Sequence, residues 1–190
     1  MKVKMILAQD AGLGIGYKGK LPWPPCKEDM RLFKMMTTGN NNESNAVVMG
    51  YDTWISLPKT YRPLPNRVNI VLSSNHYAEL SNNNECFVFD NWNNLKKHIN
   101  VFPYEEVWII GGATIYRGAI ENLPITDIIR TSFNKVYTCD RYLDMNGLLA
   151  NEGLTFDTHL ICETEDYKME HLEIKGQTKD YQLSDHHSKT

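Results

Sequence analysis

Asp29 is the acidic side chain best placed to do chemistry, because it belongs to the apolar face of a predicted helix. Cys26 to Met36 has helical spacing, and Asp29 lies one turn before Phe33, whereas Glu28 lies about 100° away round the helix. Burial among apolar side chains raises the pKa of a carboxyl group, which suits acid–base chemistry or the recognition of paired N–H donors. The alternative is an ordinary acidic residue in the first helical turn, where it favours the helix dipole.

A glycine-rich segment follows the first predicted strand and satisfies the GxGxxG pattern of dinucleotide-binding folds at Gly14, Gly16 and Gly19. That pattern works only where a helix begins at the third glycine and meets a pyrophosphate with its amino end. Here the sequence continues Lys20-Leu21-Pro22-Trp23-Pro24-Pro25, and the prolines prevent a helix. We interpret the segment as a mobile lid with a rigid far side. The alternative is an ordinary surface loop.

Strands and helices alternate along most of the chain and would position these residues. Short β-rich runs occur at Val3 to Gln9, Val47 to Met49, Val68 to Ser73, Cys86 to Phe89, Val107 to Ile110 and Asp127 to Phe133. Helical patterns occur at Cys26 to Met36, at Asn91 to Phe102 behind an Asp90 cap, and at Ala113 to Asn122. This alternation predicts a parallel α/β sheet. After Asp157, two alternating strands without a helix between them, Leu160 to Lys168 and Asp180 to Ser184, predict an antiparallel end to the sheet.

Composition and charge restrict the class of protein further. The chain has 190 residues, 42% of them hydrophobic, with a formal net charge of −3 and a pI near 6.1. The hydrophobic content excludes a disordered chain, and the length predicts one domain over residues 1–190. The charge provides no general attraction to nucleic acid or anionic lipid, and no apolar run approaches the roughly 20 residues of a membrane helix. We therefore expect neither a nucleic-acid nor a membrane partner.

Several other polar features carry no chemistry of their own. Four widely spaced cysteines form no CxxC pair, and the amino terminus lacks the pattern of a signal peptide, so we expect a reducing cytoplasm. The Asn-rich stretches Gly39 to Asn45 and Asn82 to Asn84 are interpreted as surface loops whose purpose the sequence does not give. His186-His187, in a polar and frayed carboxyl terminus, has no third ligand at a useful spacing, so we expect no metal site.

The residues singled out above lie in blocks that resemble the dihydrofolate reductase family over nearly the whole chain. The first region contains Gly14-Ile15-Gly16, Leu21-Pro22-Trp23, Asp29 one helical turn on, and Phe33-Lys34 before Thr37. The later blocks are Val48-Met49-Gly50 with Thr53-Trp54, Arg62-Pro63-Leu64-Pro65-Asn66-Arg67, Val71-Leu72-Ser73-Ser74, Ile110-Gly111-Gly112 before Tyr116, and Thr131. Chance agreement of so many blocks in order and spacing is not credible, so the resemblance is specific.

The resemblance implies both a fold and a reaction. The fold is a three-layer α/β architecture, with a central, mostly parallel mixed sheet, an antiparallel C-terminal strand and helices on both faces. The reaction is the NADPH-dependent reduction of 7,8-dihydrofolate to tetrahydrofolate, in which a hydride passes from the nicotinamide to pteridine C6 and a proton is added at N5. A protein of this family would serve one-carbon metabolism, bind antifolates and act as a monomer. Residues 45–106 would form the adenosine-binding portion of the single domain.

On the substrate side, the resemblance gives matching positions their roles. Asp29 would bind the 2-amino group and N3 of the pterin and promote protonation of N5 through water, with Thr131 hydrogen-bonded to it or to that water. Arg67 would bind the glutamate α-carboxylate through its planar guanidinium, and Arg62 would lie at the rim. The alternative for each arginine is an ordinary surface position. The other expected substrate contacts are Ile6, Ala8, Phe33, Leu57 and Ile110.

On the cofactor side, the resemblance implies that a cis peptide bond joins Gly111 and Gly112. The helix after them would present its free N–H groups to the pyrophosphate. The lid, Gly12 to Trp23, would close over the nicotinamide and exclude water. The expected catalytic residues are Leu21, Trp23, Asp29, Tyr116 and Thr131. The expected cofactor-binding residues are Ala8, Gly14, Ile15, Gly16, Gly19, Lys20, Gly50, Asp52, Thr53, Leu72, Ser73, Ser74, Ile110, Gly111, Gly112, Ala113, Thr114, Ile115 and Tyr116.

The sequence departs from the family at a few positions. Tyr51-Asp52 stands where the family usually has basic residues that help to hold the cofactor's phosphates, so Ser73, Ser74 and His76 would have to carry the 2′-phosphate. We therefore expect a weaker preference for NADPH over NADH than is usual in the family. Thr114 stands where some members have arginine. The residues after Asp140 depart from the threonine-and-aromatic sequence that often supports the lid.

Two other functions remain open at this point. One is a reductase of the same fold that acts on another heterocycle, such as the pyrimidine reductases of riboflavin synthesis. The pairing of Asp29 with Arg67 argues against it, because that pair suits a molecule with a pterin at one end and a carboxylate at the other. The second is a non-catalytic descendant that binds a nucleotide or a pterin as a structural or regulatory protein, and Tyr51-Asp52 keeps that alternative open.

Overall fold

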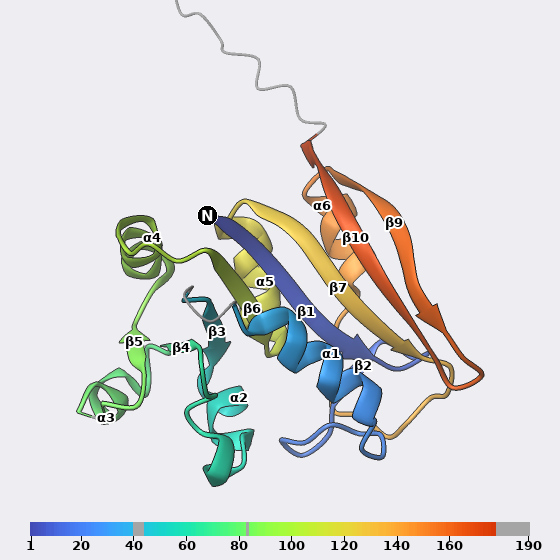
Figure 1. Ribbon diagram of the computed structural model, residues 1–190, viewed down its shortest axis with the longest axis horizontal. Coiled ribbons are helices and arrows are strands. Elements are labelled where there is room, and N and C mark those ends of the chain that lie inside the picture. The colour runs from blue at the N-terminus through green and yellow to red at the C-terminus, as the bar shows by residue number, and fades with distance from the viewer. Residues whose placement is uncertain (40–43, 83, 178–190) are drawn as a thin grey trace, which may run out of the picture.

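A computed structural model describes residues 1–39, 44–82 and 84–177 of the chain (Figure 1). The strands are β1 (Lys2–Gln9), β2 (Gly14–Gly16), β3 (Ala46–Gly50), β4 (Val68–Leu72), β5 (Phe87–Phe89), β6 (Glu106–Gly111), β7 (Ile125–Phe133), β8 (Arg141–Tyr142), β9 (Leu154–Glu163) and β10 (Tyr167–Gln177). The helices are α1 (Lys27–Thr37), α2 (Tyr51–Ser56), α3 (Tyr77–Ser81), α4 (Trp92–Val101), α5 (Ala113–Asn122) and α6 (Met145–Asn151), with a 3-10 turn, η1, at Lys59–Tyr61.

Eight of the strands form one mixed sheet in the order β5-β4-β3-β6-β1-β7-β10-β9. The six strands from β5 to β7 are parallel, β10 runs antiparallel to β7, and β9 runs antiparallel to β10. Figure 1 shows this order from β5 at the left to β9 at the right. The predicted parallel sheet with an antiparallel end is confirmed. Strands β2 and β8 pair separately, and β2 lies within the expected lid.

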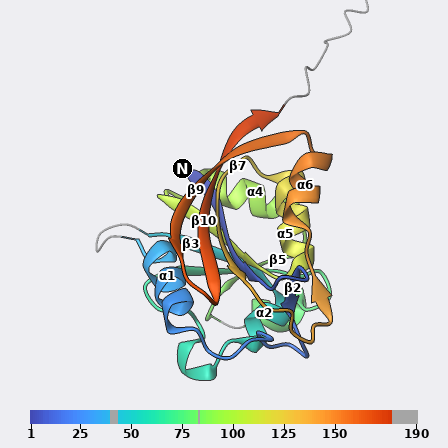
Figure 2. The same cartoon turned by 90° about the vertical axis from the view of Figure 1, so that its right-hand side faces the viewer.

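Helices cover both faces of the sheet, which gives the three layers that the resemblance implies (Figure 2). On one face, buried residues of α4, α5 and α6 pack with Val3, Met5 and Ile109 of the central strands. On the other face, α1, α2 and α3 contribute Leu32, Trp54 and Leu80 to a second cluster. Strand β3 is buried along Ala46–Met49 because both faces are covered, as is typical of parallel strands.

The C-terminal strands differ from the prediction. The predicted strand Leu160 to Lys168 is wrong, because the chain turns at residues 164–166 and begins β10 at Tyr167. The hydroxyl of Thr164 causes the turn, since it accepts hydrogen bonds from the backbone N–H groups of Asp166 (3.3 Å) and Tyr167 (3.1 Å). The strand predicted at 180–184 and the pair His186-His187 lie outside the described residues, as do positions 40–43 and 83 of the Asn-rich stretches.

Two helical details also need correction. The side chain that caps α4 is Asn91, whose Oδ1 accepts a hydrogen bond from the Asn94 N–H at 2.9 Å, and not Asp90. On α1, Met30, which is next to Asp29, is 58% exposed, while Leu32 is buried. The apolar face of α1 is therefore rotated toward Leu32, although Asp29 and Phe33 are still partly buried. No helix in the part of the chain that the structure describes is long and apolar enough to cross a membrane.

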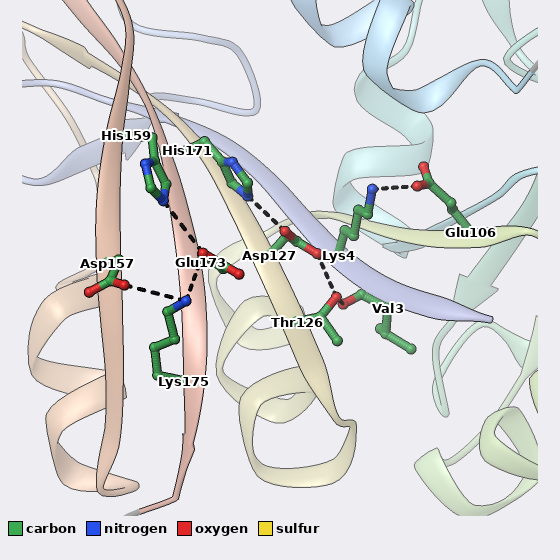
Figure 3. A network of polar contacts seen from close by, with 10 residues as sticks. All are labelled: Val3, Lys4, Glu106, Thr126, Asp127, Asp157, His159, His171, Glu173 and Lys175. Atoms are coloured by element: carbon green, nitrogen blue, oxygen red, sulfur yellow. Dashed lines mark hydrogen bonds and ion pairs between the residues drawn. The ribbon is translucent and has the colours of Figure 1, made fainter.

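The face of the sheet that α1 covers carries a network of charged side chains beyond the end of that helix (Figure 3). His171 on β10 contacts Asp127 on β7 at 2.7 Å, and Thr126 donates a hydrogen bond to the second oxygen of Asp127 at 2.6 Å. On β9 and β10, Lys175 bridges Asp157 and Glu173. Strand alternation turns Asp127 and His171 to the same face as Ile129 and Met169, so the apolar cluster under α1 gives way here to a polar, solvated surface.

A buried ion pair links β7 to β10 on the opposite face. Arg130 contacts Glu170 at 3.0 Å, and their side chains are only 11% and 7% exposed. Lys168 lies 2.7 Å from the other oxygen of Glu170, and Arg130 also donates to Asn146 at 2.8 Å. Burial alone would raise the pKa of Glu170, but the hydrogen bonds and charges of Lys168 and Arg130 outweigh it and hold that pKa below its ordinary value.

We expect Glu170→Gln to lower the free energy of unfolding by about 3 kcal/mol at pH 7, because Arg130 then keeps a buried charge without its partner. A carboxyl group whose pKa is lower in the folded state stabilises the fold above its unfolded-state pKa, and this contribution disappears as the pH falls through the folded-state pKa. The difference in the free energy of unfolding between Glu170→Gln and the parent protein should therefore become smaller in acid. Urea unfolding across pH measures it, and an equal difference at every pH would contradict the assignment. Lys135→Ala, which breaks an exposed pair with Asp166, is the control and should cost less than about 1 kcal/mol.

Candidate active site

The site predicted from sequence lies where the parallel strands end. β1, β3, β4 and β6 finish at Gln9, Gly50, Leu72 and Gly111, and β7 carries Thr131 beside Ala8 of β1. Ligands of open parallel sheets bind outside these carboxyl ends, because the loops there diverge and leave room. The pairing of β1 with β6 on one side and β7 on the other brings together residues that are more than 100 positions apart in sequence.

Asp29 is the acidic group of the site. Helix α1 holds its side chain partly buried, and burial raises the pKa of Asp29 above its ordinary value, while a hydrogen bond with the Thr131 side chain acts in the opposite direction. Thr131 is itself buried, at 1% exposure. The expected pairing of Asp29 with Thr131 is therefore present in the structure, and the raised pKa agrees with the prediction from the apolar helix face.

Tyr116 connects the site to the opposite face of the sheet. It rises from the first turns of α5, and its hydroxyl donates a hydrogen bond to the Ile6 carbonyl at 2.7 Å. Burial and then the negative charge of Asp29 raise the pKa of Tyr116, so this hydroxyl stays protonated and the two side chains lie within electrostatic reach of each other. Both residues were expected in the catalytic set.

One apolar wall contains four of the expected substrate contacts. Ile6 is buried in the cluster under α1, and Phe33, Leu57 and Ile110 are partly buried against that same cluster. Ala8 is partly buried two residues further along β1. The wall is thus built from β1, α1, β6 and the end of α2. These elements are far apart along the chain and come together only in the fold.

Arg67 lies at the far end of this wall. Its Nη1 donates to the Thr37 hydroxyl at 2.7 Å, its Nε donates to the Pro65 carbonyl at 3.0 Å, and its guanidinium lies 5.8 Å from the centre of the Phe33 ring. Burial lowers the pKa of Arg67, but an arginine stays charged in any such setting. These contacts hold the partly buried guanidinium in place, and its role toward a substrate stays a prediction.

Arg62 is placed differently. Its guanidinium lies 5.5 Å from the centre of the Trp54 ring, and its Nη1 donates to the Trp54 carbonyl at 3.5 Å. Asn69 fixes the segment between the two arginines, since it hydrogen-bonds both the N–H and the carbonyl of Leu64 at 2.9 Å. Arg62 therefore braces α2, and its place at the rim of a substrate site stays a prediction.

A glycine cradle lies at the junction of β6 and α5. The peptide bond between Gly111 and Gly112 is cis, as the resemblance implies. Gly111 has φ +117°, and a Cβ there would come within 3.2 Å of the Tyr116 ring, while a Cβ on Gly50 would lie 3.0 Å from Ile115. Backbone at these positions can therefore approach closely only as glycine.

The amino end of α5 opens beside this cradle. No side chain caps α5, so the first N–H groups of its helix, from Ala113 onward, are available to a ligand. Thr53 reaches the same place from α2, because its hydroxyl lies 3.6 Å from the Cβ position of Gly112. Thr114 is exposed and Ile115 is buried.

The end of β4 forms a second polar surface next to α2. Tyr51 stacks face to face on His76, with ring centres 3.5 Å apart and planes 2° apart, and its hydroxyl donates to Glu79 at 3.2 Å. The Ser73 hydroxyl lies 3.3 Å from His76 Nδ1, and Ser74 is exposed beside it. Asp52 points to solvent at the start of α2. The structure thus brings the expected Ser73, Ser74 and His76 together, and adds the carboxylate of Glu79 to the same surface.

The lid, Gly12–Trp23, packs on the connection between β7 and β8. β2 pairs with β8, the Asp140 N–H donates to the Gly16 carbonyl at 2.9 Å, and the Lys18 N–H donates to the Asp140 carboxylate at 3.0 Å. Trp23 is buried, with its ring 4.5 Å from that of Phe133. Among the expected lid contacts, Gly14 is buried and Ile15 partly so, whereas Gly19, Lys20 and Leu21 are exposed.

Sequence reasoning missed one residue that these contacts depend on. Asp10 follows β1 directly, is 1% exposed, and accepts hydrogen bonds from the N–H groups of Gly12, Gly14 and Tyr137. Its signal was an aspartate just before a glycine-rich turn, because such a side chain often binds the backbone N–H groups that follow it. The bond to Tyr137, 127 positions away, has no local signal.

Comparison with known proteins agrees with this geometry. A family model described as dihydrofolate reductase matches residues 2–148. The chain belongs to the dihydrofolate reductase family. It is 40% identical to the dihydrofolate reductase of Candida albicans over 130 residues, which are 67% of this chain and 65% of that protein. It is 37% identical over 124 residues to a viral dihydrofolate reductase of Saimiriine herpesvirus 2 (strain 488), and these are 60% of this chain and 55% of the viral one.

A third relative is matched over more of its length. The dihydrofolate reductase of Heliothis virescens is 37% identical over 146 residues, which are 75% of this chain and 78% of that protein. By contrast, the match covers less than two thirds of the Candida and viral proteins. The family model includes α1, the glycine cradle and β7, so every element that positions the site falls within the family's own range.

We expect Thr131→Val to raise the pKa of Asp29 further, because the hydrogen bond from the hydroxyl is the group that lowers it and valine keeps the shape of the side chain. The titration of the Asp29 carboxyl carbon, followed by NMR, measures the change. Thr126→Val removes a hydroxyl of the same strand that bonds to Asp127 instead, and it should leave the titration of Asp29 unmoved. A pKa of Asp29 that stays the same or falls in Thr131→Val would contradict the pairing.

Proposed function

We propose that the chain is an oxidoreductase that reduces 7,8-dihydrofolate to 5,6,7,8-tetrahydrofolate with NADPH. One observation carries the proposal: a partly buried Asp29 carboxyl, hydrogen-bonded with Thr131, lies on the same apolar wall as the partly buried guanidinium of Arg67. A carboxylate that recognises paired N–H donors and an arginine that recognises a carboxylate suit a long ligand with a pterin and an acid at opposite ends. The family membership supports the same activity.

The substrate would lie along the wall between these two charges. Asp29 would accept hydrogen bonds from the 2-amino group and N3 of the pterin, and the rings would pack on Ile6, Phe33, Leu57 and Ile110. Arg67 would receive the α-carboxylate of the glutamate through two parallel hydrogen bonds. Its contacts with Thr37 and Pro65 hold the guanidinium plane ready for that pairing, which limits the entropy lost on binding.

Two parts of the expected cofactor site differ in how well they fit the phosphate groups of NADPH. The cradle of Gly50, Gly111 and Gly112 and the uncapped amino end of α5 fit a pyrophosphate, which needs close backbone approach and free N–H donors. The surface of Tyr51, His76 and Glu79 fits a 2′-phosphate less well, because Glu79 places a carboxylate beside it. The cradle and the family membership still support NADPH, which we infer as the cofactor, with the adenosine across residues 45–106 of a single domain 1–190.

When bound, the dihydronicotinamide would supply the hydride that reaches C6 of the substrate. Asp29 would orient the pterin and, because burial raises its pKa, favour protonation of N5 through an ordered water. Tyr116, fixed on the Ile6 carbonyl, would support the floor of the nicotinamide pocket beside Ala8 and Ile110. The lid would exclude bulk water from both rings, so that the electrostatic effect of Asp29 is not screened.

The remaining features of the proposal concern the protein's setting. All four cysteines are free thiols, which fits a reducing compartment such as the cytoplasm. We infer a monomer, in keeping with the family to which the chain belongs. Folate analogues with a charged or donor-rich pteridine ring would compete with substrate for Asp29, and this makes antifolates expected ligands.

We expect Asp29→Asn to lower turnover roughly 100-fold or more, since the amide can neither accept both hydrogen bonds nor favour protonation. Above neutral pH, the free energy of unfolding of the same variant should be equal to or higher than that of the parent protein. A carboxyl whose pKa is raised by folding costs stability once it is ionised, and asparagine removes that cost. NADPH oxidation with dihydrofolate and urea unfolding measure the two effects.

Each alternative predicts a different result in that assay. Normal turnover by Asp29→Asn would contradict the role of the acid, and turnover by the parent on a pyrimidine of riboflavin synthesis, without turnover on dihydrofolate, would favour the other reductase. Absence of any turnover together with tight NADPH binding would favour a non-catalytic binding protein.

We expect the parent protein to discriminate weakly between NADPH and NADH, because Tyr51, Asp52 and Glu79 offer no fixed positive charge to a 2′-phosphate. Tyr51→Arg should raise the ratio of kcat/KM values for NADPH over NADH about tenfold, which corresponds to one charge-assisted hydrogen bond. Phe102→Arg adds the same charge after α4, at the amino ends of the strands, and is the control. Strong selectivity for NADPH in the parent would refute the expectation.

A further inference from the structure

Asp10 is a buried carboxylate that has no cationic partner in the ion pairs of the described residues. It is 1% exposed at the point where β1 ends and the chain turns into the lid. Burial of an ionised carboxylate costs several kcal/mol unless hydrogen bonds compensate it. In Asp10, hydrogen bonds from backbone N–H groups compensate the cost of burying the carboxylate. The same bonds also fix the backbone segments that supply these N–H groups.

The two oxygens of Asp10 serve two different segments. Oδ1 accepts from the N–H groups of Gly12 at 2.8 Å and Gly14 at 2.7 Å, both in the lid. Oδ2 accepts from the Tyr137 N–H at 2.7 Å and lies 3.6 Å from the Cys139 thiol, both in the 134–140 connection. One side chain thus ties the base of the lid to the connection on which the lid packs.

The surrounding backbone reinforces this junction. The Asp10 N–H donates to the Gly14 carbonyl at 2.9 Å, the Leu13 N–H donates back to the Asp10 carbonyl at 3.0 Å, and the Ala11 N–H donates to Lys135 at 3.1 Å. A Cβ on Gly14 would lie 2.2 Å from the Cys139 sulfur, so the thiol occupies the space that any other residue would need. The lid base is therefore closely packed as well as hydrogen-bonded.

An amide cannot replace the carboxylate here. Both oxygens of Asp10 accept from donors, and asparagine has one oxygen and one NH₂ group. In either orientation its NH₂ group faces backbone N–H donors, which leaves one segment without an acceptor and adds a repulsive contact. The ionised carboxylate is thus specifically required, and burial together with the charge of Asp10 raises the pKa of Cys139, which keeps that thiol in its neutral, donating form.

We propose that Asp10 is a positioning residue that holds the lid in its closed position over the cofactor by joining residues 12–14 to residues 137–139. This inference rests on the proposed function for its catalytic consequence. The hydrogen bonds of Asp10 given above are all with the protein, so it would act through the lid and not on substrate or cofactor directly. Asp10 would influence the lid through the residues that directly follow Gly14. Next along the chain from this junction, the Gly16 carbonyl and the Lys18 N–H form their hydrogen bonds with Asp140. A lid that is displaced at its base loses its register with Asp140, and water then enters beside the nicotinamide.

The test compares Asp10→Asn with the parent protein. We expect the single-turnover rate of hydride transfer to fall about tenfold or more, while the KM for dihydrofolate changes less than about threefold, because the apolar wall and Arg67 are untouched. Amide hydrogen exchange gives a readout independent of activity. Exchange at residues 12–20 and 137–140 should accelerate about tenfold, with the central strands β1, β6 and β7 still protected.

A second variant and a control make the result decisive. Asp10→Ser removes the carboxylate without adding an NH₂ group, so it should loosen the same segments even where Asp10→Asn folds poorly. Asp157→Asn makes the same chemical change on the exposed part of β9, where the carboxylate pairs with Lys175, and should match the parent in all measurements.

Two outcomes would overturn the proposal. In the first, exchange accelerates equally across the lid and the central strands, which would make Asp10 a residue of general stability. In the second, hydride transfer and lid exchange are both unchanged in Asp10→Asn and Asp10→Ser. If the parent shows no reductase activity, the proposed function fails, but faster exchange confined to the lid and the 134–140 connection would still establish the role of Asp10 in the lid.

Discussion

The insertion of β1 between β6 and β7 is the constraint on which the rest of the molecule depends. It sets Ala8 opposite Thr131 and brings the Ile6 carbonyl within 2.7 Å of the Tyr116 hydroxyl. Helix α1 then packs across β1 and delivers Asp29 to Thr131. Because the side-chain period of a strand is two, a register shift of one residue would turn Ile6 and Thr131 to the wrong face and remove the site. Stability and chemistry therefore depend on the same central pairing.

Glu170 and Asp10, which are buried, and Asp29, which is partly buried, are held in three different ways, and each way suits a different task. Glu170 is held by the cations Arg130 and Lys168, which lower its pKa and join β7 to β10. Asp10 is held by backbone N–H groups, which makes it a tie between two segments. Asp29 receives one hydrogen bond and an apolar setting, so its pKa rises. Only the least compensated of the three keeps capacity for a ligand, which is what a binding carboxylate requires.

Much of the fold could be predicted, since apolar periodicity is local. The helix at Ala113–Asn122 has the predicted bounds, and the six strands predicted before residue 134 agree within two residues with β1 and β3 to β7, whereas β2 was not predicted. The hairpin at 164–166 was missed because no glycine or proline marks the turn, although four consecutive polar residues, Glu163 to Asp166, interrupt the pattern there. Asp29 and Arg67 could be predicted as separate candidates, but their place on one wall depends on sheet order. The tie from Asp10 to Tyr137 depends on strand register across 127 positions, which no local pattern contains.

The anchoring of the lid restricts where it can move. Its base is fixed by Asp10, and its far end is fixed by Trp23, which packs on Phe133 and Tyr137. Between these anchors the chain makes a tight turn in which Tyr17 and Lys20 exchange backbone hydrogen bonds, and Lys18 and Gly19 adopt positive φ values of 47° and 73°. Those two residues and Leu21 are exposed. Opening therefore requires breaking the bonds of Asp140 to Gly16 and Lys18, while both ends stay in place. The movement is confined to the segment between Gly16 and Leu21, and the apolar wall and Arg67 do not have to move with it.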